Sequence, residues 1–144
     1  MQRVLIVEDT MNDLALYRPL FSADRKVFVA LVTPNPEAFS GEQAYDALSV
    51  IYEDVAKSIS RIFTMERSGV PAFLAERPFD VYLFDSLGGT AEDIVKHVQL
   101  PREKVAFFTS TGPFKEQAEK DGFRAYKKSG GQMEELVRDV FKRA

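Results

Sequence analysis

The sequence contains no cysteine and a single histidine, His97. The lack of cysteine excludes disulfides, thiolate metal sites and cysteine nucleophiles. His97 follows Lys96 in a helical pattern, where we expect it to be exposed, so neither a histidine ligand nor a histidine base is expected. No run of about 18 apolar residues is present, which argues against a transmembrane helix. The start of the chain, MQRVLIVED, has a charge inside its apolar run and no small-residue cleavage site, unlike a signal peptide.

The chain also lacks an excess of positive charge. Its 19 Lys and Arg residues against 22 Asp and Glu residues give a net charge of -3, whereas a nucleic-acid footprint normally needs clustered Lys and Arg. The 144 residues, 45% of them hydrophobic and 28% charged, are enough for one domain with a substantial core. We therefore expect one soluble, cytoplasmic domain over residues 1–144, with neither a nucleic-acid nor a membrane partner.

Short apolar runs predict the strands. They cover residues 4–7, 27–32, 81–84 and 105–108, with a weaker fifth run at 123–126. The runs are continuous rather than alternating, which is typical of parallel strands covered by helices on both faces. Helical patterns lie between them and at 133–141. The alternation of strands and helices predicts an α/β fold.

The connection between residues 32 and 81 is much longer than one helix requires. Its apolar residues recur at alternating spacings of three and four: Tyr45, Leu48, Tyr52, Val55, Ile59 and Ile62. This stripe predicts a helix of about 25 residues over 41–67, roughly 38 Å long, which exceeds the roughly 17–20 Å of a typical strand. Two interpretations follow: the stripe packs on its own sheet, or its distal half, 55–65, forms a partner or homodimer surface.

Polar side chains follow the predicted strands, at the edge of a parallel sheet where chemistry collects. The carboxylates are Glu8, Asp9 and Asp85, and the other polar residues are Thr109, Lys127 and Lys128. Carboxylate oxygens with room for water suit Mg²⁺, and a carboxylate can act as a nucleophile toward phosphorus. A lysine and a hydroxyl could then stabilise the charge on a phosphoryl group.

These motifs resemble the receiver domain of two-component response regulators. The resemblance lies in VLIVEDT, VYLFDSL, VAFFTST and AYKKSG, supported by SGEQAYDAL (40–48) and MEELVRDV as the second and fifth helices, and it covers the chain outside roughly 50–76. It implies a flavodoxin-like, doubly wound, five-stranded parallel sheet in the order 2-1-3-4-5, with residues 50–76 as an insertion or extended second helix.

The resemblance also implies roles for the residues at this edge. Asp85 would accept the phosphoryl group, and Glu8, Asp9, Asp85 and the backbone carbonyl of Leu87 would hold Mg²⁺. Thr109 would be the switch hydroxyl. The phosphoryl-binding lysine would be Lys128 or, one residue earlier, Lys127. The donor would be a histidine kinase or phosphotransfer protein and the output a protein contact, with no output domain and no metabolic enzyme activity.

Two alternatives remain open. Lys128 is followed by Ser129 where receivers usually have proline, and the loop after Asp85 is short, so the chain could be an atypical receiver that acts as a phosphorylation-independent interaction module. The segment FDSLGGT also resembles the nucleophile motif of haloacid dehalogenase-type phosphatases. That family places a second aspartate where this chain has Leu87, which disfavours this third interpretation.

Overall fold

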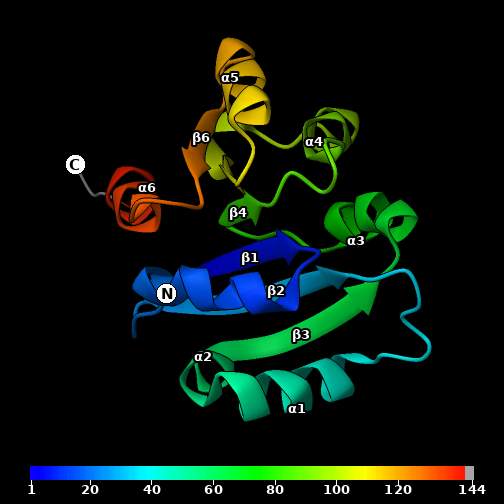
Figure 1. Ribbon diagram of the computed structural model, residues 1–144. Coiled ribbons are helices and arrows are strands. Elements are labelled where there is room, and N and C mark those ends of the chain that lie inside the picture. The colour runs from blue at the N-terminus through cyan, green and yellow to red at the C-terminus, as the bar shows by residue number, and fades with distance from the viewer. Residues whose placement is uncertain (142–144) are drawn as a thin grey trace.

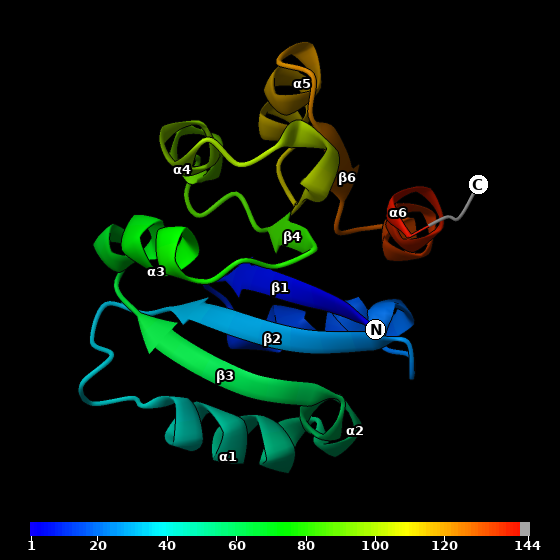
Figure 2. The same ribbon diagram turned by 180° about the vertical axis from the view of Figure 1, so that it is seen from behind.

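A computed structural model describes residues 1–141; the last three residues of the predicted 1–144 domain lie outside the described residues. Six parallel strands form one sheet in the order β3-β2-β1-β4-β5-β6. They are β1 (Gln2–Glu8), β2 (Arg25–Val32), β3 (Ile59–Met65), β4 (Val81–Phe84), β5 (Val105–Thr109) and β6 (Arg124–Lys127). The five predicted strands keep their predicted order, and β3 is an additional strand at one edge (Figures 1 and 2).

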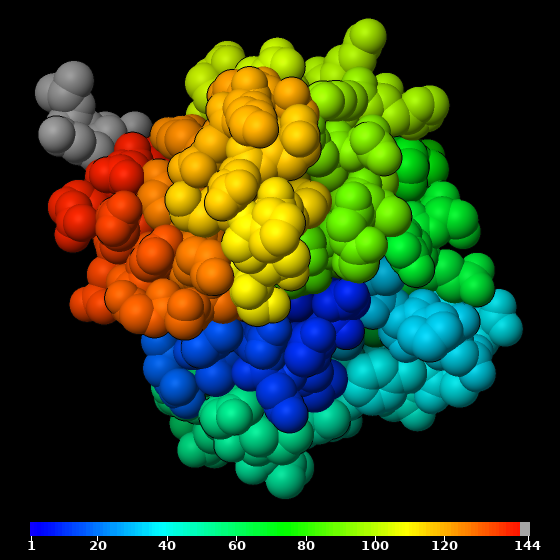
Figure 3. Space-filling view, turned by 45° about the horizontal axis from the view of Figure 1, so that its top comes forward, coloured from blue at the N-terminus to red at the C-terminus, as the bar shows by residue number. Residues whose placement is uncertain are grey.

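Helices cover both faces of the sheet, so the predicted doubly wound α/β fold is confirmed. The first face carries η1 (Met11–Leu20, a 3₁₀ helix), α1 (Gly41–Ile51), α2 (Glu53–Lys57) and α6 (Gln132–Val140). The second face carries α3 (Val70–Glu76), α4 (Ala91–Val98) and α5 (Gly112–Lys120), and the short 3₁₀ turns η2 (Arg67–Gly69) and η3 (Arg102–Lys104) lie in connections. Figure 3 shows η1, in blue, beside the orange and red C-terminal segments. Among the described residues, no helix has the length and apolarity needed to cross a bilayer.

The predicted helix over 41–67 is wrong. The α1 helix ends at Ile51, Tyr52 leaves helical geometry with φ -138° and ψ 78°, and the chain then forms α2 and β3. The distal residues of the stripe, which we predicted to form a docking surface, instead lie in the core of the first face. Val55 is fully buried, and Ile59 and Ile62 are 4% exposed. Residues 55–65 therefore do not project as a helical docking surface, and association between copies stays a prediction.

A β-bulge explains why the apolar residues of β3 have the sequence spacing of a helix. Val27 pairs with Ile59, but the next residue, Phe28, pairs with Arg61, which leaves Ser60 as an extra residue. In a regular strand, side chains two apart share a face. The extra residue instead places Ile59 and Ile62, three apart, on the first face, because a bulge opposes two residues to one. The spacing of three thus arose from a bulged strand.

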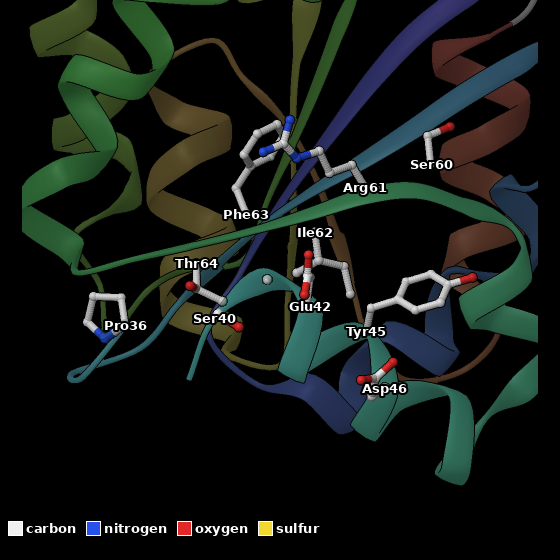
Figure 4. Close-up of a pocket in the computed structure, with 11 residues that line it drawn as sticks. Pro36, Ser40, Glu42, Tyr45, Asp46, Ser60, Arg61, Ile62, Phe63 and Thr64 are labelled. Carbon is white, nitrogen blue, oxygen red and sulfur yellow. The ribbon is translucent and has the colours of Figure 1, made fainter. Parts of the chain in front are cut away.

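The outer edge of β3 packs against the start of α1. A reciprocal capping box between Ser40 and Gln43 begins this helix. A side-chain Cβ on Gly41 would lie 2.1 Å from the carbonyl oxygen of Ile62, so only glycine permits this approach. Beside the contact is a groove of about 790 Å³ between α1 and β3 (Figure 4). Covering an edge strand with a helix limits unwanted strand pairing.

Candidate functional site

The site lies where the direction of strand order reverses. The chain builds the sheet outward from β1 through β2 to β3, then returns to the other side of β1 with β4. Val7 pairs with Phe84, so Glu8 at the end of β1 lies beside Asp85, which directly follows β4. The backbone N–H of Asp85 donates to the Val7 carbonyl at 2.8 Å. Such a switch point at the carboxyl ends of parallel strands is where α/β proteins bind ligands.

The ammonium group of Lys128 joins three carboxylates at this point. Its Nζ lies 2.9 Å from Glu8 Oε1, 2.7 Å from Asp13 Oδ2 and 2.7 Å from Asp85 Oδ1. The Lys128 side chain is only 7% exposed, so these ion pairs are poorly screened by solvent. We call Glu8, Asp9, Asp13 and Asp85, together with Lys128, the acidic cluster.

Strand alternation selects Lys128 over Lys127. In β6, Ala125 faces the second face of the sheet and Tyr126 the first. Lys128 follows Tyr126 by two residues, so it points toward the same side, where it meets the carboxylates. Lys127 points the other way, and its Nζ would be 3.8 Å from a Cβ on Gly112 at the start of α5. The catalytic role of Lys128 stays a prediction.

Glu8 is held by four donors and is completely buried. Its Oε1 accepts from Tyr17 Oη at 3.1 Å as well as from Lys128, and its Oε2 accepts from the backbone N–H groups of Asp9 and Thr10. Burial and the nearby negative charge of Asp85 raise the pKa of Glu8 to about 8, against the opposing effect of Lys128. Burial lowers the pKa of Lys128, but its carboxylate partners raise it further, and the net shift is upward. This end of the sheet therefore favours an additional cation.

Three of these carboxylates could bind a metal ion. The ligand oxygens of Glu8, Asp9 and Asp85 all lie within 4.8 Å of one another. Burial, followed by the negative charge of Asp85, raises the pKa of Asp9, because neighbouring like charges disfavour the ionised form. A cation between them would relieve that repulsion, and carboxylate oxygens suit hard divalent ions.

The loop after Asp85 is fixed by backbone geometry. Leu87, Gly88 and Gly89 have positive φ angles of 51°, 66° and 89°, a conformation that strains leucine. The loop is held because Leu87 N–H donates to Asp85 Oδ2 at 2.8 Å and the leucine side chain is buried. The Leu87 carbonyl, the predicted metal ligand, accepts from Thr90 Oγ1 at 2.7 Å and Arg67 Nη1 at 3.4 Å. Its role as a ligand stays a prediction.

Thr109, the predicted switch residue, is fully buried at the end of β5. Its Oγ1 accepts from the N–H of Thr111 at 3.0 Å. Its backbone carbonyl accepts from the N–H of Lys128 at 2.8 Å, which links the two predicted site residues through the main chain. The predicted movement of its hydroxyl toward a phosphoryl group is untested.

Sequence reasoning missed three contributors. Asp13 lies in the first turn of η1, and its signal was an acid just after Glu8-Asp9 at the start of the first helix. Tyr17 is a buried hydroxyl that resembles an ordinary core residue in the sequence. Arg67 comes from the inserted segment and, with Asp9 and Leu87, lines a cavity of about 300 Å³. No signal for Arg67 was available while 41–67 was interpreted as one helix.

Comparisons of this chain with protein-family models, with curated proteins and with solved structures found no match. The resemblance to receiver domains therefore depends on the motifs and on the placement of their residues at one edge of the sheet.

Proposed function

We propose that this chain is a receiver-type domain that accepts a phosphoryl group on Asp85 and relays that state by protein contact. The observation that carries the proposal is the environment of Asp85 at the switch point. Its Oδ1 is 2.7 Å from Lys128 Nζ, and its carboxylate belongs to a triad able to hold a metal ion. The donor would be a histidine kinase or phosphotransfer protein, and the receiver of the signal a further protein.

In the proposed step, an oxygen of the Asp85 carboxylate attacks the phosphorus of a phosphohistidine. A P–O bond forms, the P–N bond breaks, and the imidazole leaves with the electron pair, giving an aspartyl phosphate. Lys128, already 2.7 Å from Asp85, would balance charge on the phosphoryl oxygens. The Leu87 N–H orients the other Asp85 oxygen from 2.8 Å. Hydrolysis by water would later restore the carboxylate and release phosphate.

Mg²⁺ fits the donor set of this site. Glu8, Asp9 and Asp85 offer oxygens only and carry more negative charge than Lys128 can balance, which matches the preference of Mg²⁺ for carboxylates and phosphate oxygens. When bound, the ion would supply charge neutralisation for the transferring phosphoryl group. Lys128 would remain the group that holds Asp85 in place.

A second candidate function has its own supporting observation. The three ion pairs of Lys128 hold β1, η1 and the loop after β4 together without a phosphoryl group. A site already fixed in this way would suit a phosphorylation-independent interaction module that keeps the receiver fold. The two candidates predict different responses to a phosphoryl donor.

The deciding experiment is intact mass spectrometry after incubation with acetyl phosphate and Mg²⁺. The proposed function predicts one added phosphoryl group that is lost in Asp85→Asn and in metal-free buffer. Asp93→Asn, which removes an exposed aspartate on α4, should still be modified and serves as the matched control.

A parallel titration with beryllium fluoride, a phosphoryl mimic, covers the case in which the small donor does not react. Saturable, Mg²⁺-dependent binding that requires Asp85 would support the proposed acceptor. If neither reagent acts on Asp85, the interaction module becomes the better description of this chain.

A further inference from the structure

Aromatic rings gather on the second face of the sheet, in and around β2 and β3. Phe28 lies in β2 and Phe63 in β3, Phe73 comes from α3, and Phe79 precedes β4. Ring centroids are 5.5 Å apart for Phe28 and Phe79, 5.0 Å for Phe63 and Phe73, and 6.5 Å for Phe73 and Phe79. The four rings therefore form one continuous group that extends from Phe79, before β4, and Phe28 in β2 to Phe63 in the second half of β3.

Four exposed cations lie on this group of rings. Arg3 and Lys26 share the ring of Phe28, at 4.9 and 5.6 Å from its centroid. Arg61 and Arg77 share the ring of Phe63, at 4.4 and 5.2 Å. Figure 4 shows the Arg61 side chain over the Phe63 ring, on the side of β3 opposite to Ile62. We call the four cations and the four rings the cation–aromatic cluster.

The cations of this cluster have no counter-ion in the described part of the chain. Within residues 1–141, no carboxylate lies within ion-pair distance of Arg3, Lys26, Arg61 or Arg77. The nearby Asp80 carboxylate is instead bound by the backbone N–H of Arg3 at 2.7 Å. Other cations of the described chain, such as Arg18 and Lys96, do pair with carboxylates. The cluster is thus a concentration of unneutralised positive charge on an acidic protein.

The fold brings these like charges together at a cost. Arg3 and Lys26 are direct neighbours in the pairing of β1 with β2, and like charges in that relation repel. Shielding of ring faces by long side chains explains why each cation lies on a ring. This shielding does not explain why the cations have no carboxylate partner among the described residues, because an acidic side chain could pair with them without disturbing the rings. An anionic partner would relieve the repulsion.

We propose that the cation–aromatic cluster is a docking surface for an acidic segment, rich in Asp and Glu, of a partner protein. Three of the four cations are arginines, whose planar groups bind carboxylates through two parallel hydrogen bonds. A single strand of nucleic acid fits less well, because it needs free aromatic faces for its bases. Here Phe28 is 9% exposed and Phe79 4%, and their faces carry guanidinium groups.

The test measures fluorescence anisotropy of a labelled ten-residue oligoglutamate titrated with the full chain in buffer of low salt. Arg61→Gln/Arg77→Gln removes two cluster cations, and Lys104→Gln/Lys120→Gln removes two exposed lysines elsewhere, as the charge-matched control. The proposal predicts that the cluster variant loses about tenfold in affinity, about 1.4 kcal/mol, while the control stays near wild type. A second variant, Arg3→Gln/Lys26→Gln, removes the two cations on the ring of Phe28. It should show a similar loss of affinity, and it replaces the first variant if that one does not fold.

Two outcomes would overturn the proposal. An equal loss in the control pair would mean that the peptide responds only to net charge. Tighter binding of a ten-nucleotide single-stranded DNA, lost in the same cluster variants, would assign the surface to nucleic acid instead. Neither readout depends on Asp85, so the docking surface and the proposed phosphoryl acceptor are tested separately.

Discussion

The acidic cluster and the cation–aromatic cluster differ in how their charged side chains are paired. At the carboxyl ends of the strands, the ammonium of Lys128 contacts three carboxylates at 2.7 to 2.9 Å, and two of them, Glu8 and Asp85, are buried. From the amino ends of β1 and β2 across to β3, four cations lie exposed on aromatic rings with no carboxylate partner among the described residues. The charges of the acidic cluster form ion pairs within the folded chain. The cations of the cation–aromatic cluster remain accessible to an anionic partner.

The difference sets what substitution should do in each cluster. A buried charge network loses several kcal/mol when one partner is removed, because the remaining charges are left uncompensated. An exposed cation on a ring contributes only about 0.5–1 kcal/mol. Substitutions in the acidic cluster should therefore change stability, and those in the cation–aromatic cluster should mainly change binding.

The largest effect is expected for Lys128→Met. It removes the ammonium from three carboxylates while keeping most of the side-chain length, and we expect it to lower the free energy of unfolding by about 3–5 kcal/mol. The measurement is denaturant unfolding at pH 7, with Lys127→Met as the matched control, since Lys127 points toward α5 instead. Equal losses in the two variants would show that Lys128 does not hold the cluster together.

The raised pKa of Glu8 predicts how stability depends on pH. Because this pKa rises from 4.5 unfolded to about 8 folded, the folded state keeps a proton that the unfolded state gives up. The contribution of Glu8 to stability is therefore complete below pH 4.5 and is lost as pH rises toward 8, by at most about 1.4 kcal/mol per pH unit. Unfolding curves in chelator-containing buffer across that range should show the decline.

The variant Glu8→Gln provides the control for this pH dependence. It cannot titrate, so its free energy of unfolding should vary less between pH 5 and pH 8, whatever its absolute value. A decline as steep as that of the wild type would assign the effect to another group.

Arg67→Gln tests the contribution of the inserted segment to the acidic end. Arg67 reaches the Leu87 carbonyl and lines the cavity beside Asp9, so its charge would attract the negative charge that a phosphoryl group adds at Asp85. We expect about a tenfold weaker affinity for beryllium fluoride, the equivalent of one hydrogen bond to a charged group. Arg77→Gln, which removes an exposed arginine directly after the inserted segment, should bind the mimic as the wild type does.

The acidic cluster could be predicted from sequence because its signals are local. Glu8, Asp9 and Asp85 each follow an apolar run, and parallel strands bring their carboxyl ends to one edge. Spacing favours Lys128 over Lys127 by only one residue and could not settle the choice, because Ala125 and Tyr126 are both apolar and their faces are known only from packing. Asp13 was missed because an acid in the first turn of a helix has an ordinary explanation.

The cation–aromatic cluster could not be predicted, for two physical reasons. The bulge at Ser60 gave β3 a helix-like spacing, so the strand that carries Arg61 and Phe63 was not recognised. The cations also come from four separate parts of the chain, and only strand register places Arg3 beside Lys26. Each of these residues taken alone resembles a solvated surface charge.

The smallest effect on stability is expected for Lys26→Gln. The substitution removes a contact 5.6 Å from the centroid of Phe28, which is worth about 0.5–1 kcal/mol. It also removes repulsion from Arg3 of a similar size. These terms oppose each other, so denaturant unfolding should place the variant within about 0.5 kcal/mol of the wild type. A loss near that of Lys128→Met would mean that the cations of this cluster also hold the fold together, and the contrast between the two clusters would fail.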